Sequence, residues 1–227
     1  MIKKILVVAA HPDDEVLGCG ATLLRFKKQG CKIKVIFLTD GESSRLGAKN
    51  LDELVSKRKK NAEQVSNKAK FHLPVFGKFK DNQLDKEPLL HVTQFIEKEI
   101  MKFKPDTIFT HFENDLNVDH QKAFNAVNIA CRPLSKSFVK NIYCFEIPSN
   151  TNLILTRKNK KLYNPNFFVD INNFINKKIS LLKIYKSELR KWPHTRSLKG
   201  IKNLAEYRGS QVGLKFAEAF ITIREIY

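Results

Sequence analysis

The chain alternates between short apolar runs and longer segments in which apolar residues recur at helical spacing. The short runs are rich in β-branched residues and lack polar alternation, which is typical of strands buried on both faces of a parallel sheet. They predict strands at residues 2–10, 32–38, 73–76, 107–111 and 139–145. The longer segments predict helices at residues 15–28, 51–69, 89–103 and 119–130. This alternation predicts an α/β fold, Rossmann-like, with a mostly parallel sheet and helices on both faces.

The last third of the sequence is less regular. Residues 149–166 predict mostly loop, and residues 172–189 and 198–209 predict two helices. Residues 216–223 form an apolar segment of mixed pattern. No internal repeat or shift in composition divides the chain, and a length of 227 residues suits one α/β domain. We therefore assign residues 1–227 to a single domain.

The formal net charge is +18, from 41 Lys and Arg against 23 Asp and Glu. A basic surface can attract nucleic acid or an anionic metabolite. The lysines are spread along the chain, however, and only residues 57–60 and 157–161 form dense basic clusters. The aromatic–basic repeats that single-strand binders use are missing from the sequence. We expect a generally solvated basic surface, with attraction of a phosphorylated small substrate as the first alternative and nucleic acid as the second.

The sequence favours a cytoplasmic protein without a membrane span. No run approaches the roughly 18–20 apolar residues of a membrane helix. Two lysines precede the first apolar stretch, as in a signal peptide, but this stretch stops at Ala10 before a charged segment. The four cysteines are not in paired motifs and suit free thiols in a reducing compartment. The sequence carries no signal for an oligomeric state.

The first predicted strand ends directly in His11-Pro12-Asp13-Asp14-Glu15. In open parallel sheets, ligands bind at the carboxyl ends of the strands. Three adjacent carboxylates repel one another, and a divalent cation is the simplest group that neutralises them. Acidic residues also favour a helix N-terminus, which accounts for the carboxylates in part but not for His11 and Pro12. Gly18 and Gly20 then allow close backbone approach in the first turns of the helix.

A second polar, acid-rich loop follows the predicted strand at residues 107–111 and leads to His120 at the start of a helix. Two such loops can converge above one edge of the sheet. Two histidines and one carboxylate with an open position are a common arrangement for catalytic zinc. A lone histidine at a helix start would be an ordinary polar surface residue, but the pairing with the first loop favours a metal site.

Residues 11–20, His-Pro-Asp-Asp-Glu-Val-Leu-Gly-Cys-Gly, resemble the signature of the LmbE / PIG-L family of N-acetylglucosaminyl deacetylases. Residues 117–120, Asn-Val-Asp-His, resemble that family's second metal motif. The resemblance extends nearly end to end, through Arg58 and residues 79–84, 145–149, 193–197 and 208–220. The later motifs resemble bacterial members associated with the synthesis of sugars and surface glycans. The resemblance implies metal-dependent hydrolysis of the N-acetyl group of an N-acetylamino sugar.

The resemblance also implies roles for individual residues. His11, Asp14 and His120 would ligate Zn²⁺, with Fe²⁺ as the alternative that such ligands permit. Asp13 would act as the general base on water, and protonated Asp13 or another group would donate to the leaving amine. Glu15 would serve at the helix start or support its neighbours.

One position departs from the family pattern. Many relatives carry a histidine three residues before the metal-binding histidine, whereas this chain has Asn117. A carboxamide can donate a hydrogen bond to an oxyanion but cannot shuttle a proton. Asp119, which would orient the missing histidine, is expected to hold His120 or a loop amide instead. His194 is a candidate replacement, with an ordinary loop residue as the alternative. His111 is the other candidate, although we expect it to be a structural histidine at a strand end.

Arg58 and Arg196, together with His194, are the candidate substrate contacts. A guanidinium can grip phosphate with two hydrogen bonds, and the alternative for each arginine is a solvated side chain. Residues 43–50 and 149–166 are expected to cover the site. We expect the substrate to be a nucleotide-linked sugar or a surface-glycan precursor. The alternative within the enzyme class is a thiol-precursor glycoside such as a glucosaminyl malate.

Three other classes of protein fit the sequence less well. A nucleotide-cofactor oxidoreductase would need Gly-x-Gly-x-x-Gly in the first loop, where the carboxylates would instead repel a pyrophosphate. A nucleic-acid-binding module rests on charge alone and would leave both metal motifs unexplained. A non-catalytic metal-binding protein would keep zinc but would not respond to Asp13→Asn beyond small changes in stability. We therefore expect an enzyme whose partner is a small N-acetyl sugar and not a nucleic acid.

Overall fold

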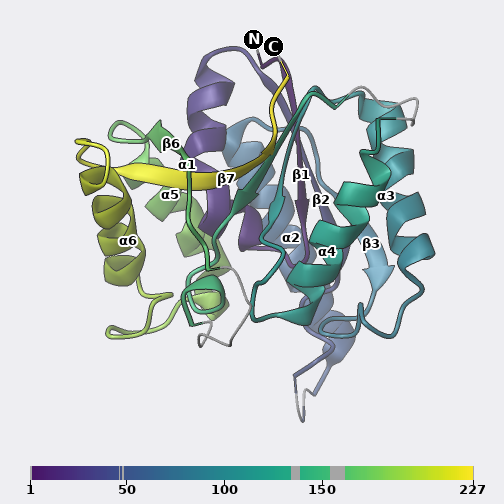
Figure 1. Ribbon diagram of the computed structural model, residues 1–227. Helices are drawn as coiled ribbons and strands as arrows, with labels where there is room; N and C mark the ends of the chain where they lie inside the picture. The colour runs from purple at the N-terminus through teal and green to yellow at the C-terminus, as the bar shows by residue number, and fades with distance from the viewer. Residues whose placement is uncertain (1, 46, 48, 134–138, 154–161, 227) are drawn as a thin grey trace.

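Seven strands form one mixed sheet in the computed structural model, which describes residues 2–45, 47, 49–133, 139–153 and 162–226 (Figure 1). The strand order is β3-β2-β1-β4-β5-β7-β6. The strands are β1 (Lys4–Ala9), β2 (Lys32–Thr39), β3 (Val75–Phe79), β4 (Thr107–His111), β5 (Asn141–Phe145), β6 (Phe167–Asp170) and β7 (Ala217–Arg224). The helices are α1 (Asp14–Lys28), α2 (Leu51–Ala69), α3 (Leu89–Phe103), α4 (Val118–Ala130), α5 (Ile175–Leu182) and α6 (Leu198–Ser210).

The first five strands are parallel, and β7 is antiparallel to both β5 and β6. Strand β2 pairs with one edge of β1, and β4, which comes later in the chain, pairs with the other edge of β1. The strand order therefore reverses at β1, and in open sheets a crevice forms at the carboxyl ends of the strands at such a point. This confirms the predicted mostly parallel sheet and places both acid-rich loops at the same edge.

Helices cover both faces of the sheet, as the buried side chains of β1 show. Ile5, Val7 and Ala9 pack with α1, α2, α5 and α6 in one hydrophobic core. Leu6 and Val8 point to the other face and pack with α3 and α4 in a second core. Gly18 is needed where α1 crosses β5, because an added Cβ would lie 2.4 Å from the ring of Phe145. This confirms the close approach predicted for that glycine.

The C-terminal third differs from the prediction in three places. The expected helix over residues 172–189 is interrupted: α5 ends at Leu182, and a 3₁₀ segment, η2 (Lys183–Glu188), follows with a non-helical Tyr185. The segment at residues 216–223 is β7, a regular strand, and β6 was not predicted at all. The edge strand β6 has only four residues, and so short a pattern cannot be distinguished from a loop in the sequence. The mixed pattern of β7 is recognised as a strand only from its pairing with β5 and β6.

None of the helices in the described part of the chain is long and apolar enough to cross a membrane. The assignment of residues 1–227 to a single domain stays a prediction. The continuous sheet, which joins strands from both ends of the chain, supports it.

Candidate metal centre and catalytic cleft

The candidate site lies where β1 and β4 end. His11 lies two residues beyond the last residue of β1, and Asp14 is the first residue of α1. His120 lies in the first turn of α4, in the connection that leaves β4. The turn between β1 and α1 is tight, because the backbone N–H of His11 donates to Oδ2 of Asp14 and that of Asp14 donates to the carbonyl of His11. The sheet thus brings His120 to His11 and Asp14, which lie more than 100 positions earlier in the sequence.

Three potential ligand atoms converge at this point. Nδ1 of His11 lies 3.1 Å from Oδ2 of Asp14 and 3.3 Å from Nε2 of His120. Nε2 of His120 lies 3.4 Å from the same carboxylate oxygen. Zinc ligands at bond lengths of 2.0–2.1 Å in a tetrahedron are roughly 3.3 Å apart, so the three spacings suit one cation. All three residues are buried, and we refer to His11, Asp14 and His120 as the metal cluster.

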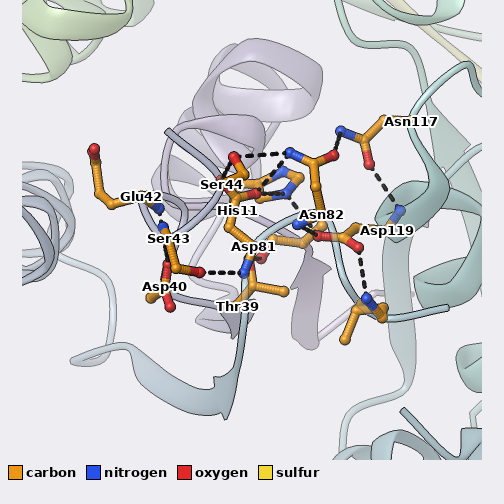
Figure 2. Close-up of polar contacts among 12 residues, drawn as sticks. His11, Thr39, Asp40, Glu42, Ser43, Ser44, Asp81, Asn82, Asn117 and Asp119 are labelled. Carbon is orange, nitrogen blue, oxygen red and sulfur yellow. Dashed lines mark hydrogen bonds and ion pairs between the residues drawn. The ribbon is translucent and has the colours of Figure 1, made fainter. Parts of the chain in front are cut away.

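Carboxylates face the remaining nitrogen of each imidazole. Nδ1 of His120 lies 3.0 Å from Asp115. Nε2 of His11 lies 2.9 Å from Asp81 and 3.1 Å from Asp119, and Figure 2 shows these three residues. A carboxylate at one nitrogen holds the ring proton there and leaves the other nitrogen as a lone pair. The lone pairs of both rings then point at each other and at Asp14. This arrangement is unfavourable without a cation, so the residues present fit a divalent metal.

The electrostatics of the metal cluster agree with that fit. Burial opposes charge on His120, yet Asp14 and Asp115 raise its pKa to about 9. Burial likewise opposes charge on Asp14, but His120 and His11 hold its pKa well below its usual value. The surroundings therefore favour positive charge at the point where the three ligand atoms meet.

Asp13 lies beside the metal cluster in a strained conformation. Its φ of 132° is rare for a residue other than glycine. Its backbone N–H donates to Oε2 of Glu15 at 2.9 Å, and the hydroxyl of Tyr185 donates to Oε1 of Glu15 at 2.8 Å. Burial raises the pKa of Asp13 to about 6, although Arg58 and Arg196 favour its charged form. Glu15 thus supports its neighbour, one of the two roles expected for it.

A cleft of about 300 Å³ opens over His11 and Asp13. The cleft is also lined by Arg45, Arg58, Arg190, Arg196 and Glu188, which we call the arginine cluster. Arg58 is only 4% exposed and lies 2.6 Å from Glu188 and 3.8 Å from Asp13. Arg196 lies 3.3 Å from Asp13. The structure therefore points the two arginines expected to bind substrate at the candidate base, and Arg58 is already surrounded by carboxylates.

Asn117 and Asp119 tie the start of α4 to the loop after β3. Oδ1 of Asn117 accepts from the backbone N–H of Asp119, and its Nδ2 donates to Asn82 (Figure 2). Asp119 accepts from the backbone N–H groups of Asn82 and Leu84. Asp119 thus holds loop amides, one of the two alternatives predicted for it. The residue that faces His120 is Asp115.

The remaining predicted residues also lie near the cleft. His194 lines it, and Nδ1 of His194 accepts from the backbone N–H of Arg196. His111 is fully buried: its Nε2 accepts from the backbone N–H of Ala10 and its ring stacks on His120, as a structural histidine would. Both loops expected to cover the site contribute lining residues: Ser44, Arg45, Ser149 and Asn150. Residues 46, 48 and 154–161, including the basic stretch at 157–161, lie outside the described residues.

Sequence reasoning did not single out Asp115, Tyr185, Glu188 and Arg190. Asp115 carried a weak signal, because it lies in the acid-rich loop before His120. The other three lie in or just after the segment predicted as a regular helix, where no spacing marks them. Only the 3₁₀ segment turns Tyr185 and Glu188 inward.

The fold and the site together define an α/β protein with a His–Asp–His centre of the kind that metal-dependent hydrolases use. A family model described as GlcNAc-PI de-N-acetylase (PIG-L) matches residues 6–131, more than half of the chain. The chain therefore belongs to the PIG-L family of deacetylases, whose members act on N-acetyl sugars.

Individual relatives agree with this assignment. The uncharacterized deacetylase YaiS of Escherichia coli (strain K12) is 29% identical over 156 residues, which are 65% of this chain and 75% of the relative. Diacetylchitobiose deacetylase of Thermococcus kodakarensis is 24% identical over 240 residues, covering 100% of this chain and 85% of the relative. The solved structure of N,N'-diacetylchitobiose deacetylase from Pyrococcus horikoshii shares the fold, with a TM-score of 0.79 at 18% identity over 98% of this chain and 84% of that one. These matches do not favour the nucleic-acid-binding alternative.

Proposed function

We propose that this protein hydrolyses the N-acetyl group of an N-acetylamino sugar and releases acetate, with Zn²⁺ as the metal and Fe²⁺ as the alternative. The observation that carries the proposal is the convergence of three lone-pair atoms beside Asp13, a buried carboxylate in a strained conformation. Membership of a deacetylase family supports the same reaction. The nucleotide-linked or surface-glycan nature of the sugar and the cytoplasmic location stay predictions.

His11, Asp14 and His120 would hold the cation, with Asp81, Asp115 and Asp119 fixing the two imidazole rings. When bound there, the cation supplies Lewis acidity that draws electrons from the acetyl carbonyl and makes water more acidic. Asp13 takes a proton from the attacking water, whose oxygen bonds to the acetyl carbon. The C–N bond then breaks, and protonated Asp13 returns the proton to the leaving amine. The products are acetate and the free amino sugar.

Four other residues of the cleft assist in this proposal. Asn117 keeps one Nδ2–H beyond the hydrogen bond to Asn82, and it can donate this hydrogen to the developing oxyanion. Arg58 and Arg196 hold Asp13 in place through their charges, and Arg196 and His194 also line the space that the sugar would occupy. Both arginines stay protonated in these roles.

The experiment is acetate release by zinc-loaded protein from N-acetylglucosamine, its phosphates and short chitooligosaccharides. We expect activity that a chelator removes, and Asp13→Asn to lower kcat by about 10²–10⁴-fold. Bound metal, measured by elemental analysis, should be unchanged in Asp13→Asn. Asp85→Asn, the same change at an exposed position, is the matched control. Full activity in Asp13→Asn would contradict the assignment of the base, and absence of acetate from every substrate would contradict the reaction.

A further inference from the structure

The four arginines of the cleft differ in their partners. Arg45 lies 2.6 Å from both Glu42 and Glu188, and Arg58 lies 2.6 Å from Glu188. Arg196 lies 3.3 Å from Asp13. Arg190 also lines the cleft, but none of the ion pairs between described residues includes it. Within the described part of the chain, no carboxylate therefore lies at ion-pair distance from its guanidinium.

The sequence supports this account of Arg190. Residues 46, 48, 134–138 and 154–161 contain no Asp or Glu, so they hold no side-chain carboxylate for it. The stretch from Arg190 to Ser197 is also free of acidic residues and includes Lys191, His194 and Arg196. An uncompensated positive rim on a cleft concentrates anions there and raises their rate of association.

The guanidinium of Arg190 is held in place by its own segment. Nη1 donates to the backbone carbonyls of Ser187 at 2.6 Å and Leu189 at 3.2 Å. The other N–H groups of this guanidinium have no hydrogen-bond partner among the described residues. A guanidinium that is fixed at Nη1 and keeps the donors of Nε and Nη2 is arranged for a phosphate or carboxylate, which accepts two parallel hydrogen bonds.

The rest of the cleft offers hydrogen bonds and charge rather than apolar contact. Among the described residues, no aliphatic side chain and no Phe, Tyr or Trp ring lines it. Its volume of about 300 Å³ is at the small end of ligand clefts, which span roughly 300–1,000 Å³. A substrate that fits it gains little from hydrophobic burial, so a charged group has a large share in selecting it.

We propose that Arg190 binds an anionic group of the substrate, so that the preferred substrate is an N-acetylamino sugar carrying a phosphate or a carboxylate. This inference rests on the proposed deacetylase function and assigns the anion to Arg190 rather than to the ion-paired Arg58 and Arg196. Arg190 selects the substrate and takes no part in bond breaking. Its contribution therefore appears in KM more than in kcat.

The test compares kcat/KM of the zinc-loaded protein on neutral N-acetylglucosamine with that on anionic derivatives. N-acetylglucosamine 1-phosphate and 6-phosphate and a nucleotide-linked N-acetylglucosamine represent phosphate, and N-acetylglucosaminyl malate represents carboxylate. We expect at least one anionic substrate to be preferred by about tenfold or more. Arg190→Gln should bring this ratio close to one, through KM. Lys191→Gln, which removes the same charge from the adjacent exposed residue outside the cleft, should keep the preference.

A binding measurement separates this inference from the reaction itself. By titration calorimetry, glucosamine phosphates should bind more tightly than glucosamine to the wild type, and Arg190→Gln should lose that difference. Hydrolysis with no preference for any anionic substrate, or a preference that survives Arg190→Gln, overturns the role of Arg190 and leaves the deacetylase function standing. Absence of acetate from all substrates overturns the function instead.

Discussion

The two sides of the cleft are built in different ways. The metal cluster comes from the ends of β1 and β4, two adjacent parallel strands, and each of its residues lies within a few positions of a strand or helix terminus. The arginine cluster is drawn from a loop after β2, from α2, from η2 and from the segment after it. The register of a parallel sheet positions the first side, whereas ion pairs between distant segments position the second. Asp13 lies between them and contacts both.

Replacing His120 by Gln should break the metal side and leave the arginine side intact. One of three cation ligands is lost, so bound zinc should fall from about one per chain to near zero after dialysis, and activity should be lost with it. Asp115→Asn, which removes only the charge facing His120, should weaken zinc binding by roughly 10–100-fold. The measurement is elemental analysis, together with the rise in melting temperature that zinc produces. A zinc-dependent rise as large in His120→Gln as in the wild type would contradict the ligand assignment.

Glu188→Gln should break the arginine side and leave metal binding intact. Glu188 lies 2.6 Å from both Arg58 and Arg45, and losing its charge leaves Arg58 buried with weaker partners. We expect a loss of roughly 2–3 kcal/mol in the free energy of unfolding, measured in urea, with unchanged zinc content. Glu63→Gln, the same change on the exposed face of α2, should cost almost nothing. Equal stability of the two variants would show that the arginine cluster does not hold the cleft together.

The effect of Glu188→Gln should depend on pH in a defined direction. Although burial opposes its charge, Arg58 and Arg45 lower the pKa of Glu188 below 4.5 in the folded protein. A carboxylate whose pKa is lowered by folding stabilises the folded protein at pH values above its pKa in the unfolded chain. This stabilisation is lost as the pH falls through its pKa in the folded protein. The difference in stability between wild type and Glu188→Gln should therefore be full at neutral pH and shrink below about pH 4.5. A difference that grows on acidification would contradict the ion pairs.

The metal cluster could be predicted from the sequence to a larger extent than the arginine cluster. The bounds of α2, α3 and β4 agree with the periodicity, and α1 and α4 start within one residue of the prediction. Once these elements are in place, sheet topology alone brings His11, Asp14 and His120 to one edge. Short-range pattern and a general rule about parallel strands therefore predict that the two acid-rich loops meet, whereas the choice of these three residues as ligands came from the family resemblance.

The arginine side could not be predicted in the same way. Nothing near Glu188 in the sequence indicates that it pairs with Arg58, which lies 130 positions earlier. The pattern from residue 172 to 189 continues at helical spacing, and only the tertiary contacts of Tyr185 and Glu188 account for the change to a 3₁₀ segment. Arg58 was singled out through family resemblance, and its burial among carboxylates was not foreseen.

Tyr185→Phe gives the smallest and sharpest test, because it acts on Asp13 through Glu15 and keeps the ring that packs 5.8 Å from the guanidinium of Arg58. The change removes the hydroxyl that holds Glu15, which in turn holds the backbone N–H of the strained Asp13. We expect kcat to fall by about 3–10-fold with KM and zinc content nearly unchanged, as for the loss of one hydrogen bond of about 1 kcal/mol that positions a base. Tyr163→Phe is the matched control, since its hydroxyl donates to the carbonyls of Cys144 and Ala219 outside the cleft. Both variants should lose comparable stability, but only Tyr185→Phe should lower kcat. If kcat is unchanged in both variants, Tyr185 stabilises the fold and does not position Asp13. The strained conformation of Asp13 would then be maintained by the turn between β1 and α1.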